Sequence, residues 1–487
     1  MNAPVRKVAV AVLVLFAALF VNLNYVQVVE ANKLRRNPSN QRLLLQTYER
    51  QRGTIVVGDT AIAASTATQD RYKYLRSYPG RALYAPVTGY YSLVYGSAAM
   101  EHAQDSVLSG EDDRLFVRRI SDLVTGRSPR GGNVVLTLDP AGQAAAARLL
   151  GRQRGSVVAL DPRSGAILTM VTSPSYDPNA LAGHDLARVK AAWAAIKATP
   201  GRPLVNRAVQ ETYPIGSTMK VIISAAALQH GYRPDTTIDS PRTYTPPQTS
   251  RPLPNYEGEV CSGSGRQKLI DALTVSCNTA FAKLGVTLGA DRIRAQAALF
   301  GVGEAALKLP LSVSTSELGA LADPPQVAQS SIGQRDVRFT PLQNAMVAAA
   351  VANAGVLERP YLVKEIQAPD FTSLERAQPA ELHRPMPPDV AAELQTMMRS
   401  VVDRGTGTAA QIPGYVVGGK TGTAQNAGPD HGWFIGFAGK EGQAPPVAIA
   451  VVLENAGRGG SRAAATIAGK VMAAILASSG AGAGAGR

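Results

Sequence analysis

The chain has 487 residues, which is enough for two to four domains of ordinary size. It is 45% hydrophobic and only 18% charged, so it can bury a large core and is not typical of a disordered protein. The net charge of +14 suits anionic partners, but basic residues form no long run and only 6% of residues are aromatic, which argues against nucleic acid.

An apolar segment near the N-terminus decides the compartment. Residues 8–28 follow Arg6 and Lys7, and they begin strictly apolar and become mixed towards the end. The segment is long enough to cross the hydrocarbon core, which takes about 20 residues. The preceding basic residues favour an anchor with residues 1–7 in the cytoplasm and the bulk of the chain outside. A cleaved signal peptide is the alternative, although residues 30–32 make a poor cleavage site.

Residues 29–153 carry no catalytic cluster. Short apolar runs, such as Gly53–Val57, alternate there with polar, glycine-containing connections. This pattern predicts a strand-rich pedestal or dimerisation-like domain. A strand over 133–139 and an alanine-rich helix over 140–150 close the region, with Pro140 in the first turn of the helix, where proline is favoured.

Residues 154–477 predict a second domain with sheet-forming segments at both of its ends. A hairpin is expected over 155–171. Near the C-terminus we expect strands over 415–425, 431–438 and 447–453, then a helix over 462–477. A long alanine-rich helical region, roughly 185–405, lies between the two groups.

One antiparallel sheet built from both ends and covered by helices is the simplest arrangement. It corresponds to an α/β fold of the α+β type. The final residues, 478–487, are glycine and alanine of low complexity and are expected to be disordered.

Three short motifs carry possible chemistry. Ser217 precedes Lys220 at the start of a strongly helical apolar run, so the two side chains are expected about one turn apart on one face. A buried lysine of lowered pKa can take the proton of a serine nucleophile. The backbone N–H groups of a helix N-terminus can stabilise an oxyanion. Alone, the Ser-x-x-Lys pattern is more often a solvated helix face.

The other two motifs are also weak in isolation. Ser276 and Asn278 offer a hydroxyl and an amide after a helical stretch, but such a tripeptide is more often a helix cap. Lys420, Thr421, Gly422 and Thr423 form a strand in which glycine lets a ligand approach and the other side chains suit an anion. The alternative without a functional role is an edge strand that carries a surface lysine.

Together and in this order, the three motifs resemble those of penicillin-binding proteins and serine β-lactamases. Further segments look like class B penicillin-binding proteins from the anchor to about residue 477. They are Arg52–Ile55, Leu136–Asp139, Asn206–Ala208, Ser331–Gln334, Thr340–Gln343 and Gly405–Ala409. The chain departs from the family at Pro214-Ile215, before Gly-Ser-Thr, and its front module looks short.

The resemblance implies a D,D-transpeptidase that cross-links peptidoglycan stem peptides at division and is acylated by β-lactams. No metal or cofactor is implied. By position, it implies Ser217 as the acylated nucleophile, Lys220 as general base and Ser276 as proton relay. It implies that Asn278 contacts the substrate amide, that Lys420 keeps the site electropositive, and that Thr421 and Thr423, on either side of Gly422, bind the donor carboxylate. The N–H groups of Ser217 and Thr423 would form the oxyanion hole.

The two cysteines have alternative interpretations. In an exported protein Cys261 and Cys277 could form a disulfide, which would stabilise the fold by about 3 kcal/mol for a loop of this size. Two unrelated buried thiols are the alternative. A catalytic Cys277 is disfavoured, because no histidine base stands beside it in the sequence.

Two other functions fit the motifs. A β-lactamase or D,D-carboxypeptidase acylates the same serine and differs in whether water reaches the acyl-enzyme, and the anchor and front module favour the transpeptidase. A β-lactam sensor or an inactive division scaffold is the non-enzymatic alternative. The expected partners are stem peptides, lipid-linked precursor strands, β-lactams, the membrane, division proteins and a separate glycosyltransferase polymerase, because no glycosyltransferase domain is evident in the sequence.

Overall fold

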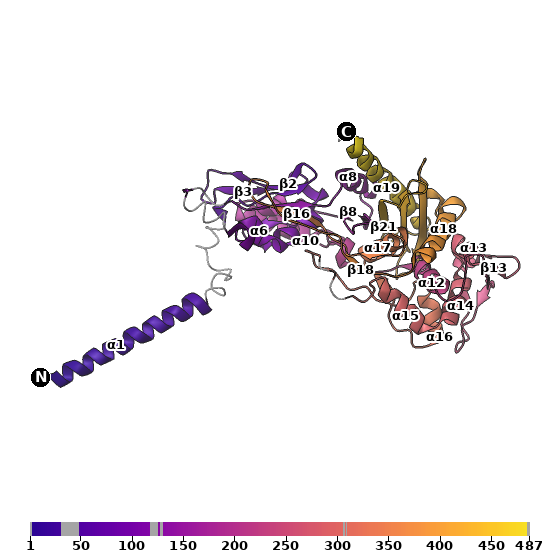
Figure 1. Cartoon of the computed structure of the whole chain (residues 1–487), viewed down its shortest axis with the longest axis horizontal. Coiled ribbons are helices and arrows are strands. Elements are labelled where there is room, and N and C mark those ends of the chain that lie inside the picture. Colours follow the sequence, from indigo (N-terminus) through magenta and orange to yellow (C-terminus); the bar gives the residue numbers. More distant parts are fainter. Residues whose placement is uncertain are drawn as a thin grey trace.

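The computed structural model describes residues 2–30, 48–116, 125–126, 130–304, 307 and 309–484. Helix α1 (Asn2–Asn24) continues as the π-helical turn η1 (Tyr25–Val29) and stands apart from the rest of the chain (Figure 1). The span Pro4–Val29 is long and apolar enough to cross a membrane, and none of its most apolar part is buried against protein. The helix is therefore a candidate membrane anchor.

A six-stranded sheet forms the centre of the N-terminal module, in the order β17-β16-β6-β1-β2-β3. Its strands are β1 (Ile55–Val57), β2 (Thr60–Ala67), β3 (Tyr74–Ser77), β6 (Asn133–Leu136), β16 (Val363–Gln367) and β17 (Ser373–Arg376). Short elements beside it are α4 (Ala85–Thr88), α5 (Ala99–Ala103), α6 (Asp105–Ser109) and the ladder of β4 (Tyr91–Ser92) with β5 (Gly96–Ser97). The module is strand-rich, as the sequence predicts.

Two strands of this sheet come from the second half of the chain. β16 pairs antiparallel with β6 and continues into β17, so the hairpin over 363–376 completes the N-terminal sheet. The hairpin therefore belongs by sequence to the expected second domain, residues 154–477, but pairs with the sheet of the first. The free edge of β6 accepts a strand regardless of its position in the sequence, which local pattern does not reveal.

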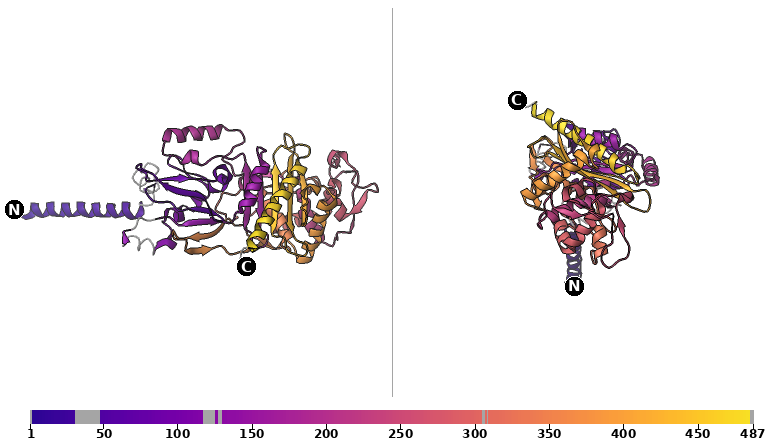
Figure 2. Two further views of the ribbon diagram at one scale, coloured as in Figure 1. Left: turned by 90° about the horizontal axis from the view of Figure 1, so that it is seen from above. Right: turned by 90° about the vertical axis from the view of Figure 1, so that its right-hand side faces the viewer.

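Two helices also depart from the predicted division. α8 (Pro140–Leu150) packs on the C-terminal helix rather than on the N-terminal sheet. Helix α10 (Leu186–Ala198) lies over the N-terminal module (Figure 2), where Trp193 stacks on Tyr95 with ring centroids 4.3 Å apart. The two modules therefore exchange elements across their boundary.

The second sheet is antiparallel throughout and has the order β19-β20-β21-β7-β8. Its strands are β7 (Gly155–Leu160), β8 (Ile167–Ser173), β19 (Val416–Ala424), β20 (His431–Gly439) and β21 (Val447–Leu453). The prediction of one antiparallel sheet assembled from distant parts of the chain is confirmed.

Helices cover both faces of this sheet. In β21, Val447, Ile449 and Val451 join a core with α8 and α19 (Gly460–Gly484), while the alternate Ala448 and Ala450 belong to the core on the other face. Successive strand residues point to opposite faces, so the wholly buried β21 must be apolar at every position. The second face carries α17 (Pro341–Ala352) and, further out, the buried α12 (Met219–Leu228).

Five further helices lie around α12 beside the sheet (Figure 1). They are α13 (Leu269–Thr274), α14 (Asn278–Leu288), α15 (Ala290–Leu299), α16 (Pro324–Ser330) and α18 (Pro388–Arg404). Edge strand β19 runs past α18 and the start of α12. The open edge of the sheet is thus the place where the three sequence motifs meet.

Helix α19 extends beyond its predicted end at residue 477 and reaches Gly484. The prediction of disorder over 478–487 is therefore wrong for residues 478–484, and residues 485–487 lie outside the described part of the chain. The Ser478 hydroxyl donates to Asp139 Oδ2 at 2.7 Å, which fastens this part of the helix to the N-terminus of α8. Alanine-rich sequence also favours helix once a packed segment has nucleated it.

A buried carboxylate holds the N-terminal module together. Glu101 has no exposed surface, and its two oxygens accept from Arg52 Nε at 2.7 Å and from Arg76 Nε at 2.6 Å. The Tyr78 hydroxyl also donates to it at 3.1 Å. Burial opposes the charge on Glu101, but the two arginines outweigh it and lower its pKa.

We expect Glu101→Gln to lower the free energy of unfolding of the N-terminal module by about 3–5 kcal/mol, because it leaves the buried Arg76 guanidinium without its anion and Arg52 with only the exposed Asp105. Thermal unfolding of the full chain in detergent checks this. The matched control is Glu111→Gln, which removes an exposed ion pair with Arg50 and should change the melting temperature little. Equal shifts in the two variants would contradict the assignment.

Candidate active site

A tight turn presents Ser217. The residue lies in the 3-10 turn η4 (Gly216–Thr218), which leads directly into α12, as the sequence predicts. Gly216 has φ +54°, and its N–H donates to the Gly333 carbonyl at 2.9 Å. A Cβ atom at Gly216 would lie 2.3 Å from the Thr423 carbonyl oxygen. Glycine is therefore required for the turn to press against β19.

Lys220 is fully buried one turn beyond Ser217. Its Nζ donates to the Ser276 carbonyl at 2.6 Å and to Asn278 Oδ1 at 2.7 Å, rather than to Ser217 Oγ, within the described part of the chain. Burial, and then the charge of Lys420, lower the pKa of the Lys220 amine well below its usual range. A neutral amine has two N–H groups and one lone pair. The two short contacts use both N–H groups, which leaves the lone pair to accept a proton.

Lys420 is the second buried amine of the site. Its Nζ donates to Ser276 Oγ at 2.8 Å and to the Thr421 carbonyl at 3.0 Å. Burial lowers the pKa of the Lys420 amine to about 7. Because Lys220 Nζ also lies 3.3 Å from Ser276 Oγ, this hydroxyl joins the two amines. A proton can therefore pass between the amines through one hydroxyl.

Ser276 owes its place to an unusual backbone conformation. It has φ +61° and lies in the connection between α13 and α14, so Asn278 begins α14. A non-glycine residue rarely adopts this left-handed region, and such strain is typical of functional sites. The neighbouring Cys277 forms a disulfide with Cys261, with the two Cα atoms 5.8 Å apart. This bond excludes both the pair of free thiols and the thiol nucleophile.

Strand β19 forms one wall of the site. The Thr421 and Thr406 hydroxyls lie 2.6 Å apart, so Thr406 orients the Thr421 side chain. The Thr423 carbonyl accepts from Gln334 Nε2 at 3.3 Å on the open side of the strand. A strand residue turns its N–H and C=O to the same side. The Thr423 N–H therefore faces the cleft and is available to an oxyanion, as is the N–H of Ser217 at the start of the helix.

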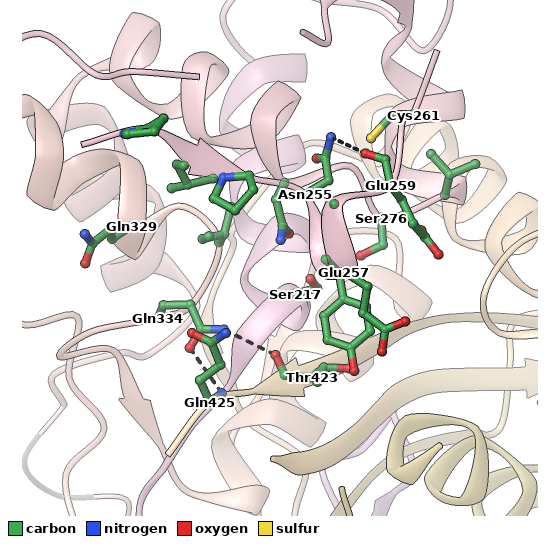
Figure 3. A pocket seen from close by; sticks show the side chains of 18 of the residues that line it. Ser217, Asn255, Glu257, Glu259, Cys261, Ser276, Gln329, Gln334, Thr423 and Gln425 are labelled. Carbon is green, nitrogen blue, oxygen red and sulfur yellow. Dashed lines mark hydrogen bonds between the residues drawn. The ribbon is translucent and has the colours of Figure 1, made fainter. Parts of the chain in front are cut away.

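These groups line an open cleft of about 840 Å³. Figure 3 shows Ser217, Ser276 and Thr423 around it, with Gln334 bridging Thr423 and Gln425. The predicted residues in its lining are Ser217, Ser276, Asn278, Thr421 and Thr423. Lys220 and Lys420 are buried behind this surface. The arrangement brings together a serine hydroxyl, a buried amine of lowered pKa, and a second hydroxyl that contacts two amines.

The unusual Pro214-Ile215 pair does not loosen the loop before Ser217. Ile215 is fully buried, and the Pro214 carbonyl accepts from Trp433 Nε1 at 2.9 Å. Glu454 forms a buried ion pair with Arg207 at 2.7 Å, and its carboxylate also accepts a hydrogen bond from the Tyr213 hydroxyl at 2.8 Å. The loop that departs from the family pattern is therefore anchored by buried contacts in this chain.

Several residues that support the cleft had no predicted role. Gly333 and Gln334 entered only as part of a resemblance, yet they contact the nucleophile turn and the edge of β19 directly. The segment 249–261 lines the cleft and carried no recognised motif. Their roles come from contacts between residues far apart in the chain, for which the sequence holds no local signal.

Comparisons with known proteins agree with this geometry. Residues 155–473 match the penicillin binding protein transpeptidase domain, and residues 52–134 match the penicillin binding protein A dimerisation domain. Peptidoglycan D,D-transpeptidase PbpA of Mycolicibacterium smegmatis is 46% identical over 477 residues, which covers 96% of each chain. The protein of the same name from Mycobacterium tuberculosis is 43% identical over 476 residues, again 96% of each.

A solved structure supports the same relationship. The imipenem acyl-enzyme complex of penicillin-binding protein A from M. tuberculosis superposes with a TM-score of 0.85 at 43% identity, covering 89% of this chain and 100% of that one. The resemblance drawn from the motifs is thereby confirmed. The chain belongs to the penicillin-binding protein transpeptidases.

Proposed function

We propose that this peptidoglycan D,D-transpeptidase works through an acyl ester on Ser217. The observation that carries the proposal is the buried Lys220 amine, whose pKa is lowered by burial, one helical turn from the half-buried Ser217 that lines the cleft. Lys420 is buried behind the same cleft. Relatives that share nearly the whole length are named peptidoglycan D,D-transpeptidases. A related structure is a β-lactam acyl-enzyme, which supports the same chemistry here.

Acylation follows from the contacts. Lys220 takes the Ser217 proton as Oγ attacks the carbonyl of the penultimate D-alanine of the donor stem. Ser276 then passes a proton from the amine pair to the departing D-alanine nitrogen, since its hydroxyl contacts both lysines. The N–H groups of Ser217 and Thr423 stabilise the oxyanion.

Donor recognition uses the opposite wall. The donor carboxylate binds the Thr421 and Thr423 hydroxyls beside Lys420, and Gly422 keeps the strand close to the nucleophile turn. A Cβ atom at Gly422 would lie 2.7 Å from the Ile215 carbonyl oxygen. Asn278 holds the substrate amide while its Oδ1 accepts from Lys220. An amine of a second stem then replaces Ser217 on the acyl group.

The anchor sets where this reaction takes place. An N-terminal helix whose apolar part follows Arg6 and Lys7 supports a single span over residues 8–28, with residues 1–7 in the cytoplasm and the cleft outside. We assign the chain a role in wall synthesis at division. It would cross-link lipid-linked precursor strands that a separate glycosyltransferase polymerase extends, in association with division proteins.

Fluorescent penicillin labelling of the full-length protein tests the nucleophile. Ser217→Ala should abolish labelling, and Lys220→Met should slow acylation by about 10²–10⁴-fold, the usual contribution of a general base. Lys440→Met, at an exposed lysine outside the cleft, should label normally. Retained labelling in folded Ser217→Ala protein would contradict the proposal, and release of the bound penicillin within seconds would favour a β-lactamase.

The two lysines predict a bell-shaped pH profile. At low penicillin concentration, the acylation rate constant should rise with pH as Lys220 loses its proton and becomes a base. It should fall above a pH of about 7, because Lys420 has a pKa of about 7 and then loses the charge that attracts the carboxylate. Stopped-flow acylation at several pH values measures both limbs.

Lys420→Arg separates the two limbs. A guanidinium stays charged throughout this range, so the fall at high pH should disappear while the rise at low pH remains. A fall at high pH that persists unchanged in Lys420→Arg would show that another group causes it.

A further inference from the structure

The cleft has a second wall that the acylation chemistry does not use. We call residues 255–261 the roof segment; five of its residues that line the cleft with Ser217 are Asn255, Tyr256, Glu257, Glu259 and Cys261. Figure 3 shows Glu257 and Glu259 around the same opening as Ser217 and Thr423. The β19 wall thus has Lys420 buried behind it, and the roof segment carries two carboxylates.

The roof segment is held at both ends. The buried Asn255 side chain accepts from the Thr279 N–H at 3.0 Å and donates to the Glu259 carbonyl at 3.0 Å. At the other end, Cys261 is bonded to Cys277, the residue after Ser276. Between these anchors, Glu257 is held at φ +51°, where non-glycine residues are rare. The fold therefore presents Glu257 at a fixed position over the cleft.

Glu257 already binds a cation from a distant segment of the chain. Its Oε2 lies 2.9 Å from an Arg458 guanidinium nitrogen, and Arg458 lies in the connection between β21 and α19. The Arg458 side chain is 84% exposed and that of Glu257 is 41% exposed. An ion pair this exposed contributes only about 0–1 kcal/mol. Another cation that enters the cleft can therefore displace Arg458.

The second substrate of the reaction is such a cation. The acceptor is an amine on a neighbouring stem, which is an ammonium group in neutral water. The charged form of Lys420 repels it from the β19 wall, so a carboxylate on the opposite side favours its binding. Glu259, which has no ion pair in the described part of the chain, adds to the negative potential there.

We infer that Glu257 releases Arg458 and binds the ammonium group of the acceptor stem peptide in its place. The inference rests on the proposed function. The ammonium first loses one proton to solvent. The amine nitrogen then bonds to the acyl carbon, the ester bond to Ser217 Oγ breaks, and the second proton from nitrogen returns to Oγ. Glu257 thus determines whether an amine or water takes the acyl group.

The partition of the acyl-enzyme between amine and water tests this. Full-length protein in detergent is given a thioester donor that acylates Ser217 and a peptide with a lysine side-chain amine as acceptor. The measured quantity is the acceptor concentration at which amide and acid products form in equal amounts. In Glu257→Gln this concentration should be about tenfold higher than in the wild type. Arg458→Ala should lower that concentration, since it frees Glu257. High salt should shrink both effects.

A matched ion pair outside the cleft supplies the control. Arg399 and Glu441 lie 2.9 Å apart on the surface, so Glu441→Gln and Arg399→Ala should leave the partition unchanged. Penicillin acylation is measured in every variant. If wild-type protein forms no adduct, the proposed function fails. If it forms the adduct but Glu257→Gln leaves the partition unchanged, or Glu257→Gln and Arg458→Ala shift it in the same direction, the inference is overturned.

Discussion

Two buried amines that share one hydroxyl are the constraint on which this active site depends. The Nζ atoms of Lys220 and Lys420 lie 3.3 and 2.8 Å from Ser276 Oγ, and neither makes an ion pair with a carboxylate in the described part of the chain. Two uncompensated charges at this depth would repel each other strongly. The pair is therefore stable with at least one amine neutral, which is the state that a serine nucleophile requires.

The rest of the fold maintains this arrangement. Helix α12 is buried along its length and fixes Lys220, while edge strand β19 fixes Lys420. Close backbone contacts, such as Gly216 with Thr423, leave no room for a side chain between the nucleophile turn and the strand. The Cys261–Cys277 bond holds the third element, the connection that carries Ser276. Catalysis and stability thus depend on the same contacts.

The elements that depend on local sequence pattern were predicted from the sequence. The five strands of the second sheet, the helix after Ser217 and the apolar anchor each follow from periodicity and composition. The hairpin over 363–376 was missed because its pairing with β6 is a long-range choice. The extension of α19 to Gly484 was missed because composition alone does not show that Ser478 binds Asp139. The motifs predicted most of the cleft, but the roof segment has no motif, and its role depends on Arg458 from a distant connection.

The protonation state of Lys220 tests the central claim most directly. NMR of protein labelled at lysine Cε, with Lys220→Arg used to assign the signal, can follow its titration. The account predicts that Lys220 is neutral at pH 8 and that Lys420→Met raises its pKa, since a neighbouring positive charge is removed. A Lys220 signal that titrates near 10.4, the ordinary value for lysine, and that does not respond to the change at Lys420 would contradict it.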